Sequence, residues 1–139
     1  MYQVIDRDRG GINSLTFNGK MLFTGCQNGS VFEHDIRIQR RERKISGFKN
    51  QEILTLKFQP NNNCFLGCSD MGGNLKIWDA RNRKVSLRIK LKNKERMNHQ
   101  FHGHGINSQP NNEKNVIRAF DWHPKNHNLL VYGDNTTET

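Results

Sequence analysis

Long apolar stretches are missing from this chain. Hydrophobic residues make up only 33% of its 139 positions, and the longest aliphatic run is Leu129–Tyr132. A membrane-spanning helix needs about 20 consecutive apolar residues, and a secretory signal needs an apolar core that residues 1–10 lack. We therefore expect a protein that is neither membrane-embedded nor secreted, located in the nucleus and cytoplasm.

Cysteine is scarce, and its pattern argues against a disulfide framework. The three cysteines are Cys26, Cys64 and Cys68, an odd number without disulfide-like spacing, which suits a reducing compartment. In an extended strand Cys64 and Cys68 would share a face but stand about 13 Å apart. We interpret them as small buried hydrophobic residues rather than metal ligands.

Motifs for catalysis are missing as well. The chain has no nucleophile elbow, phosphate-binding loop, paired-carboxylate motif or metalloprotease helix. Its Gly72-Gly73 pair is followed by a strand pattern rather than by a helix. The sequence therefore predicts a protein without enzymatic activity and without a cofactor.

A histidine cluster is the candidate metal site, and it consists of His99, His102 and His104. Such a run can bind zinc or nickel. No cysteine or acidic residue stands at a usual ligand spacing in the surrounding polar segment. We favour a solvated insertion rich in asparagine and histidine, and a metal-binding protein is the less favoured alternative.

Basic residues outnumber acidic ones by 22 to 13, which gives a formal net charge of +9. Positive surfaces attract acidic proteins, nucleic acid and anionic membranes. In Lys84–Lys92, however, cations alternate with Val85, Leu87, Ile89 and Leu91, as in a strand with one buried and one cationic face. Lysine on an edge strand discourages pairing with other chains, and this stretch lacks the aromatic residues on which bases stack. We therefore expect no nucleic-acid partner.

A repeated unit is the strongest positive signal in the sequence. Its most complete copy, Ile53–Arg81, has an apolar strand, a Pro-Asn turn, a second strand, a Gly-rich turn and a third strand ending in Trp-Asp. Landmarks recur at offsets between 41 and 44 residues: Ser14–Phe17 with Thr55–Phe58, Gly25-Cys26 with Gly67-Cys68, and Asp35–Arg37 with Asp79–Arg81. A third copy begins at Val116 and stops after its second strand. Periods of about 40–45 residues with Trp-Asp endings are typical of WD-repeat propeller blades.

The sequence therefore predicts an all-β fold, a partial WD-repeat β-propeller with about two four-stranded blades and the start of a third. The expected divisions are 1–49 and 50–92 for the two blades, 93–115 for a disordered polar insertion, and 116–139 for the first half of a further blade. In the first blade we expect the outer strand and its exit turn at Ile45–Phe48.

Protein binding is the expected role of such a chain, because propeller loops are held on a rigid scaffold. Its first and last strands would leave open sheet edges, so we also expect it to self-associate. One alternative keeps the fold and makes the chain a generic WD-repeat scaffold, for example in an RNA-associated complex, where a charge of +9 would be useful.

Several segments resemble the Fizzy and Fizzy-related family, the WD-repeat activators of the anaphase-promoting complex. That family's third blade ends in His-Asp-Val-Arg where most WD repeats have Trp-Asp, and His34–Arg37 reads His-Asp-Ile-Arg. Further similarities lie at Ile45–Gly47, Gln51–Ile53, Val116–Trp122, Pro124, Asn128–Leu130, Gly133 and Thr136. The resemblance covers nearly the whole chain except Asn93–Asn115, and it places the chain between the third and the early fifth blade.

The resemblance implies a receptor that brings degron-bearing substrates to a ubiquitin ligase, with ligase subunits and substrates as protein partners. The family's KEN-motif pocket contains a threonine that aligns with Thr136 and two asparagines that align with Met71 and Gly73. Asp70 and Asn74 stand close enough in sequence to substitute if the turn is rearranged. We therefore take Asp70, Asn74 and Thr136 as candidate degron-binding residues.

The chain also departs from the family pattern. The ligase-docking C-box and Ile-Arg tail have no counterpart in this sequence, and neither have the first and last blades that form the destruction-box groove. Gly47-Phe48 replaces the Gly-His pair that usually precedes a blade. Phenylalanine there exchanges a hydrogen-bonding side chain for a packing contact.

Overall fold

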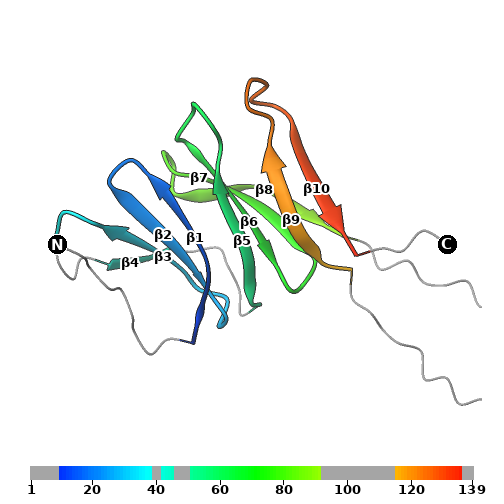
Figure 1. Cartoon of the computed structure of the whole chain (residues 1–139), viewed down its shortest axis with the longest axis horizontal. Helices are drawn as coiled ribbons and strands as arrows, with labels where there is room; N and C mark the ends of the chain where they lie inside the picture. The colour runs from blue at the N-terminus through cyan, green and yellow to red at the C-terminus, as the bar shows by residue number, and fades with distance from the viewer. Residues whose placement is uncertain (1–9, 39–41, 46–50, 92–114, 136–139) are drawn as a thin grey trace, which may run out of the picture.

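The computed structural model describes residues 10–38, 42–45, 51–91 and 115–135. These residues form ten β-strands (Figure 1). The strands are β1 (Ile12–Asn18), β2 (Met21–Cys26), β3 (Val31–Asp35), β4 (Glu42–Ile45), β5 (Ile53–Phe58), β6 (Phe65–Asp70), β7 (Asn74–Asp79), β8 (Lys84–Lys90), β9 (Ile117–Trp122) and β10 (Leu130–Asp134). Within the described ranges, no helix has the length and apolarity needed to cross a membrane.

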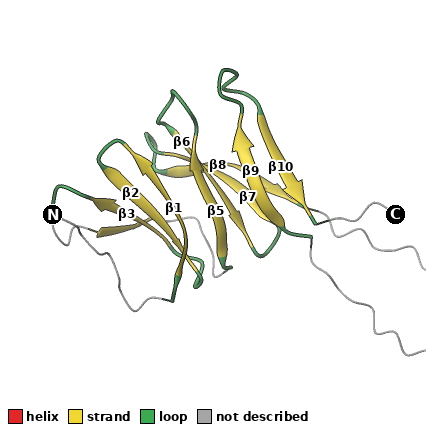
Figure 2. Ribbon diagram, in the orientation of Figure 1, coloured by secondary structure: helices red, strands yellow, loops and turns green. Residues whose placement is uncertain are grey.

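The strands form three antiparallel sheets, in the orders β1-β2-β3-β4, β5-β6-β7-β8 and β9-β10. Each sheet is a meander whose consecutive strands are joined by turns or loops (Figure 2). The first strands of the three sheets, β1, β5 and β9, lie side by side, so that the sheets stack face to face (Figure 1). The predicted all-β fold of two four-stranded blades and the start of a third is confirmed.

The two complete blades align residue by residue. Ser14–Phe17 and Thr55–Phe58 are equivalent, with an offset of 41, as predicted. From the second strand on the offset is 44, because the β5–β6 turn is longer than the β1–β2 turn. Asp35 and Asp79 therefore occupy the same place at the end of the third strand.

The longer turn corrects one predicted landmark. Gly25 pairs with Ser14, and Ser69 pairs with Thr55. Because Ser14 and Thr55 are equivalent, the structural counterpart of Gly25 is Ser69. The predicted match of Gly25 with Gly67 is wrong, since its offset of 42 equals neither the offset of 41 before the turn nor the offset of 44 after it.

The outer strand of the first blade lies earlier than expected. β4 spans Glu42–Ile45 rather than Ile45–Phe48, and residues 46–50 lie outside the described part of the chain. Ile45 pairs with Val31, and both side chains are buried. Burial of this pair sets the register, so Arg43 and Lys44 belong to the strand rather than to the preceding loop.

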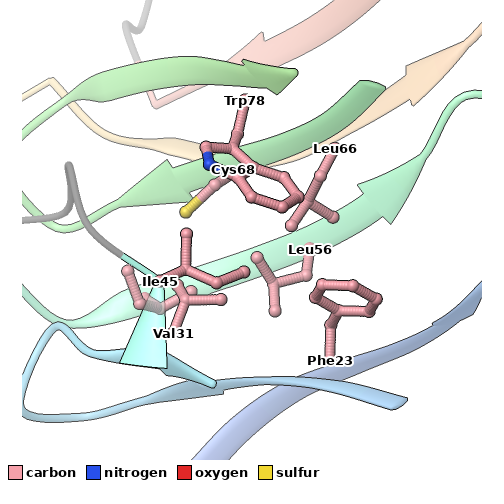
Figure 3. Packing of buried hydrophobic residues seen from close by; sticks show 8 residues of the cluster. Phe23, Val31, Ile45, Leu56, Leu66, Cys68 and Trp78 are labelled. Atoms are coloured by element: carbon pink, nitrogen blue, oxygen red, sulfur yellow. The ribbon is translucent and has the colours of Figure 1, made fainter. Parts of the chain in front are cut away.

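The main core lies between the first two sheets (Figure 3). Its buried side chains are Phe23, Val31, Ile45, Ile53, Leu56, Leu66, Cys68 and Trp78. The rings of Phe23 and Phe58 meet edge to face, with their centroids 4.8 Å apart. Burying one such aliphatic or aromatic side chain stabilises a fold by about 1.5–3 kcal/mol, so this cluster couples the two blades.

A smaller core joins the second sheet to β9 and β10, and its buried members are Leu75, Ile117 and Phe120. Trp122 Nε1 donates a hydrogen bond to Lys57 O at 3.1 Å, which ties β9 to β5. Gly67 permits the close contact, because a Cβ there would stand 2.5 Å from the Phe120 ring.

One predicted strand face is wrong. The alternation in β8 puts Val85 and Leu87 on one buried face, but Leu87 is 51% exposed and Val85 is half-buried. A bulge at Ser86 places Val85 opposite Trp78 and Leu87 opposite Ile77. Successive residues of β7 point to opposite faces, so Val85 and Leu87 do too.

Candidate partner-binding site

Two of the candidate residues, Asp70 and Asn74, lie at the end of the stacked sheets where β1, β5 and β9 begin, hereafter the proximal rim, at the lower side of Figure 1. The β6–β7 turn belongs to this rim. Met71 N donates to Glu52 O at 2.8 Å, which ties the turn to the start of β5. Leu91 N donates to Gly73 O at 2.9 Å, so the residue after β8 holds the other side of the turn.

Asp70 closes the β6–β7 turn from the inside. Its Oδ1 accepts hydrogen bonds from Gly72 N at 2.9 Å, from Asn74 N at 3.1 Å and from Asn74 Nδ2 at 2.8 Å. The Lys76 ammonium lies 3.4 Å from its Oδ2. Asp70 is only 2% exposed, so a carboxylate bonded to backbone donors and a buried cation holds the turn in one geometry.

The structure therefore brings two of the three candidate residues together. Asp70 and Asn74 are bonded to each other, and Asn74 is only partly buried. Thr136 lies outside the described residues; it follows Asn135, whose Oδ1 accepts a hydrogen bond from Val116 N at 2.7 Å on the same rim. Degron binding by these residues stays a prediction.

Gly73 cannot carry the side chain that the resembling family has at this position. Its φ is +74°, and a Cβ there would collide with the Asn115 carbonyl oxygen. The backbone of the neighbouring blade fills the space beside the turn, so this position requires glycine.

Sequence reasoning missed a polar contact between blades at the proximal rim. Asn13 Nδ2 donates to Glu52 Oε1 at 2.6 Å and to Ile53 O at 3.2 Å. A register shift between Ile12 and Ser14 marks a bulge at Asn13, and the second blade repeats it at the start of β5. A polar residue inside an apolar strand is the only signal of this contact in the sequence.

The opposite end of the sheets, the distal rim, carries the same ion pair twice. Nη2 of Arg37 lies 2.7 Å from Oδ2 of Asp35, and Nη2 of Arg81 lies 3.0 Å from Oδ2 of Asp79. In both pairs, the backbone N–H and the side-chain Nε of the arginine also donate hydrogen bonds to Oδ1 of the aspartate. The side-chain hydrogen bond from Arg81 lowers the pKa of Asp79, and each aspartate raises the pKa of its arginine. The recurring Asp-x-Arg therefore closes the turn after the third strand.

The ends of the third strands also differ chemically. His34 Nε2 lies 3.0 Å from Thr24 Oγ1, and both residues are buried. In the second blade Trp78 takes the place of His34 and Cys68 that of Thr24. Trp78 Nε1 finds no hydrogen-bond partner in the described structure. Burial raises the pKa of the Cys68 thiol, and sulfur is in any case a weaker hydrogen-bond acceptor than the hydroxyl of Thr24.

The positions of the cysteines and histidines decide whether the described part of the chain could hold a metal ion. Cys68 is buried, as predicted, whereas Cys64 is only half-buried, and none of the three described cysteines forms a disulfide. Over the part of the chain that the structure describes, no group of three or more His, Cys, Asp or Glu is placed to hold a metal ion. The cluster of His99, His102 and His104 lies outside that part, so its reading as a solvated insertion stays a prediction.

Comparison with known proteins agrees with the stacked-sheet architecture. Residues 40–79 match the protein-family model described as "WD domain, G-beta repeat". The beta-propeller domain of Myceliophteria thermophila Cps50 (Swd1) superimposes with a TM-score of 0.66 at 17% identity, covering 93% of this chain and 34% of that chain. This chain has a WD-repeat β-propeller fold. A chain of the Mitotic Checkpoint Complex is similar in fold, with a TM-score of 0.64 at 22% identity. The match covers 88% of this WD-repeat chain and 31% of the chain from that complex.

Two curated proteins are similar in sequence to the WD-repeat chain. Anaphase-promoting complex subunit cdc20 of Dictyostelium discoideum is 28% identical over 127 residues, which are 89% of this chain and 21% of the relative. DDB1- and CUL4-associated factor 4 of Bos taurus is 30% identical over 67 residues, which are 46% of this chain and 13% of the relative. The chain thus spans about a fifth of the first relative's length and less of the second. WD-repeat propellers bind protein partners and typically act as non-enzymatic interaction scaffolds.

Proposed function

We propose that this chain belongs to a substrate-recognising activator of the anaphase-promoting complex ubiquitin ligase, acting in cell-cycle protein degradation in the nucleus and cytoplasm. The observation that carries the proposal is the 28% identity to anaphase-promoting complex subunit cdc20 over 89% of the chain. The His-Asp-Ile-Arg ending of the first blade, His34–Arg37, supports it, because most WD repeats have Trp-Asp there.

In this proposal, degron-bearing substrates bind Asn74, which lies on the proximal rim, and Thr136. Asn74 Nδ2 donates to both carboxylate oxygens of Asp70, at 2.8 and 3.1 Å. This contact directs the amide nitrogen inward, so the side-chain oxygen is the end that would accept a hydrogen bond from a bound peptide. Asp70 is then a positioning residue that orients Asn74.

A fluorescent peptide that contains Lys-Glu-Asn tests the site by anisotropy, using the complete chain. We expect saturable binding that Asn74→Ala weakens about tenfold, which corresponds to one lost hydrogen bond. Asn82→Ala is the matched control, because Asn82 is an exposed turn asparagine of the distal rim, bonded to Asp79. Lack of binding by the parent chain, or equal weakening by both variants, would contradict the site.

Affinity purification of the tagged chain from dividing cells tests the ligase association. We expect subunits of the anaphase-promoting complex to be enriched over a tag-only control. Their absence from the purified material would contradict the activator role, whatever the peptide measurement gives.

A second candidate function follows from the other curated relative. That protein is named a DDB1- and CUL4-associated factor, and it is 30% identical over 67 residues of this chain. Recovery of DDB1 and CUL4 in the same purification, without anaphase-promoting complex subunits, would favour this assembly. Recovery of RNA that is lost steeply with rising salt would instead support an RNA-associated scaffold.

A further inference from the structure

Each blade uses three apolar residues of its first strand to pack on the blade before it. In β5 the residues packed against the first sheet are Ile53, Leu56 and Phe58. In β9 the residues packed against the second sheet are Ile117, Phe120 and Trp122. The blade contact is thus made twice within this chain by the same three positions.

β1 carries the equivalent residues, Ile12, Leu15 and Phe17, hereafter the β1 strip. Strand pairing sets the equivalence, because Ile12 precedes the same bulge in β1 that Ile53 precedes in β5. All three side chains of the strip are exposed, Leu15 by 59% and Phe17 by 56%. The strip therefore has the chemistry of a blade contact, but no blade within the described ranges packs on it.

The outward face of β9 and β10 carries the complementary half of this contact. Phe23 on β2 packs against Phe58 of the next blade. Val131 on β10 is the equivalent of Phe23, because Val131 pairs with Asp121 as Phe23 pairs with Thr16. Val131 is 63% exposed.

Gly133 repeats a second part of the contact. Gly25 lies directly under Ile53 of the next blade, so that a Cβ on Gly25 would collide with the isoleucine side chain. Gly133 is the equivalent of Gly25, and a Cβ there would meet no atom of the described residues within 4 Å. The place that Ile53 fills over Gly25 is therefore open over Gly133, and the residue equivalent to Ile53 in the β1 strip is Ile12.

We propose that copies of this chain bind one another head to tail, with the β1 strip of one copy on the Val131–Gly133 face of the next. Ile12 would fill the space over Gly133, and Phe17 would meet Val131. The backbones of neighbouring blades approach each other through their inner two strands, and β9 and β10 are the corresponding pair of the third unit.

A second copy is the occupant because one chain carries both halves of the interface. The contact is heterologous, since different surfaces meet, and repetition of it produces a ring or an open chain of copies. It differs from pairing at open sheet edges, because it needs particular side chains on the sheet faces. It is also independent of any ligase partner.

Light scattering coupled to size exclusion tests the proposal over a wide concentration range. We expect oligomers from the parent chain, and monomers from both the Leu15→Thr/Phe17→Thr variant and the Gly133→Val variant. Gly133 has open space and lies in a strand, where a β-branched residue is favourable. Mixing the two variants should give a one-to-one dimer, because each retains the half of the interface that the other has lost.

Leu87→Thr is the matched control, since Leu87 is a similarly exposed apolar residue on the outer strand β8. Circular dichroism and thermal melting verify that all variants fold. A parent chain that stays monomeric overturns the proposal, as does a Gly133→Val variant that still forms oligomers. Equal loss of oligomers in Leu87→Thr would show unspecific adhesion and overturns it too.

Discussion

His34 and Trp78 occupy the same place in the two complete blades but meet different partners. His34 lies within hydrogen-bonding distance of Thr24. In the second blade cysteine replaces that threonine, and the Trp78 indole N–H has no hydrogen-bond partner in the described structure. A buried donor without a partner costs about 1–3 kcal/mol. The second blade tolerates this cost because Trp78 lies in the main core.

Cys68→Ser should therefore stabilise the chain. The hydroxyl is close in size to the thiol, and at the equivalent place the Thr24 hydroxyl lies 3.0 Å from His34 Nε2. We therefore expect the serine to accept a hydrogen bond from Trp78 Nε1 and the free energy of unfolding to rise by about 1 kcal/mol in urea titrations. Cys64→Ser, at a half-buried position before β6, should leave it within a few tenths. A fall in stability for Cys68→Ser would show that the indole donor is not the dominant cost.

The pKa of Asp79 gives a second prediction at this scale. Arg81→Gln removes the hydrogen bond that lowers this pKa, so it should rise toward the ordinary value of 3.8. A carboxyl group whose pKa is lower in the folded state than in the unfolded state stabilises the fold at pH values above its unfolded-state pKa. This stabilisation is lost as the pH falls through the folded-state pKa. The parent chain should therefore lose more stability on acidification than Arg81→Gln does.

Carboxyl NMR titration of Asp79, with urea unfolding at neutral and acidic pH, measures both effects. Arg88→Gln is the charge-matched control, because Arg88 lies on the exposed side of β8. An unchanged Asp79 pKa in Arg81→Gln would show that the ion pair does not set it.

The β6–β7 turn is the element on which the candidate site depends. Its four residues from Asp70 to Gly73 turn around one buried carboxylate, whereas the β2–β3 turn of the first blade has Asn28 Oδ1 accepting from Ser30 N at 3.0 Å. Cys26 stands where Asp70 stands in the second blade. The two turns therefore have different internal chemistry on the same scaffold.

Asp70→Ala should cost about 3 kcal/mol of unfolding free energy. The substitution leaves the Lys76 ammonium buried without its carboxylate, and removal of one member of a buried pair costs about 3–5 kcal/mol. Asn28→Ala, which removes a single neutral hydrogen bond, should cost only about 1 kcal/mol. Equal costs in urea titrations would show that the Asp70 network adds nothing beyond an ordinary turn.

At the scale of the whole molecule, two cores of unequal size hold the three sheets. The larger one joins the first two blades and contains eight buried side chains, whereas the smaller one contains three. The first two blades should thus unfold as a unit, and β9 and β10 should open at lower free energy.

Hydrogen exchange of two core variants tests this division. Phe23→Ala should destabilise the chain by about 4 kcal/mol and speed exchange in both four-stranded sheets, because its ring packs between them. Phe120→Ala should speed exchange mainly in β9 and β10. Uniform acceleration along the chain in both variants would contradict the unequal coupling.

The sequence by itself determined the strand content, the repeat and the WD-repeat fold. Its period of about 40 residues and its turn residues are local properties that each blade expresses alone. It also predicted that Cys68 is buried. The family resemblance named Asp70 and Asn74, but it did not indicate that they bond to each other.

Only the tertiary structure decided the register. The bulge at Ser86 exposes Leu87, the longer β5–β6 turn makes Ser69 the counterpart of Gly25, and burial against Val31 moves the outer strand to Glu42–Ile45. Each of these three features depends on which residues of two neighbouring strands pair with each other. A one-residue change in pairing reverses the faces of a strand while leaving its composition unchanged, so the sequence pattern alone does not fix it.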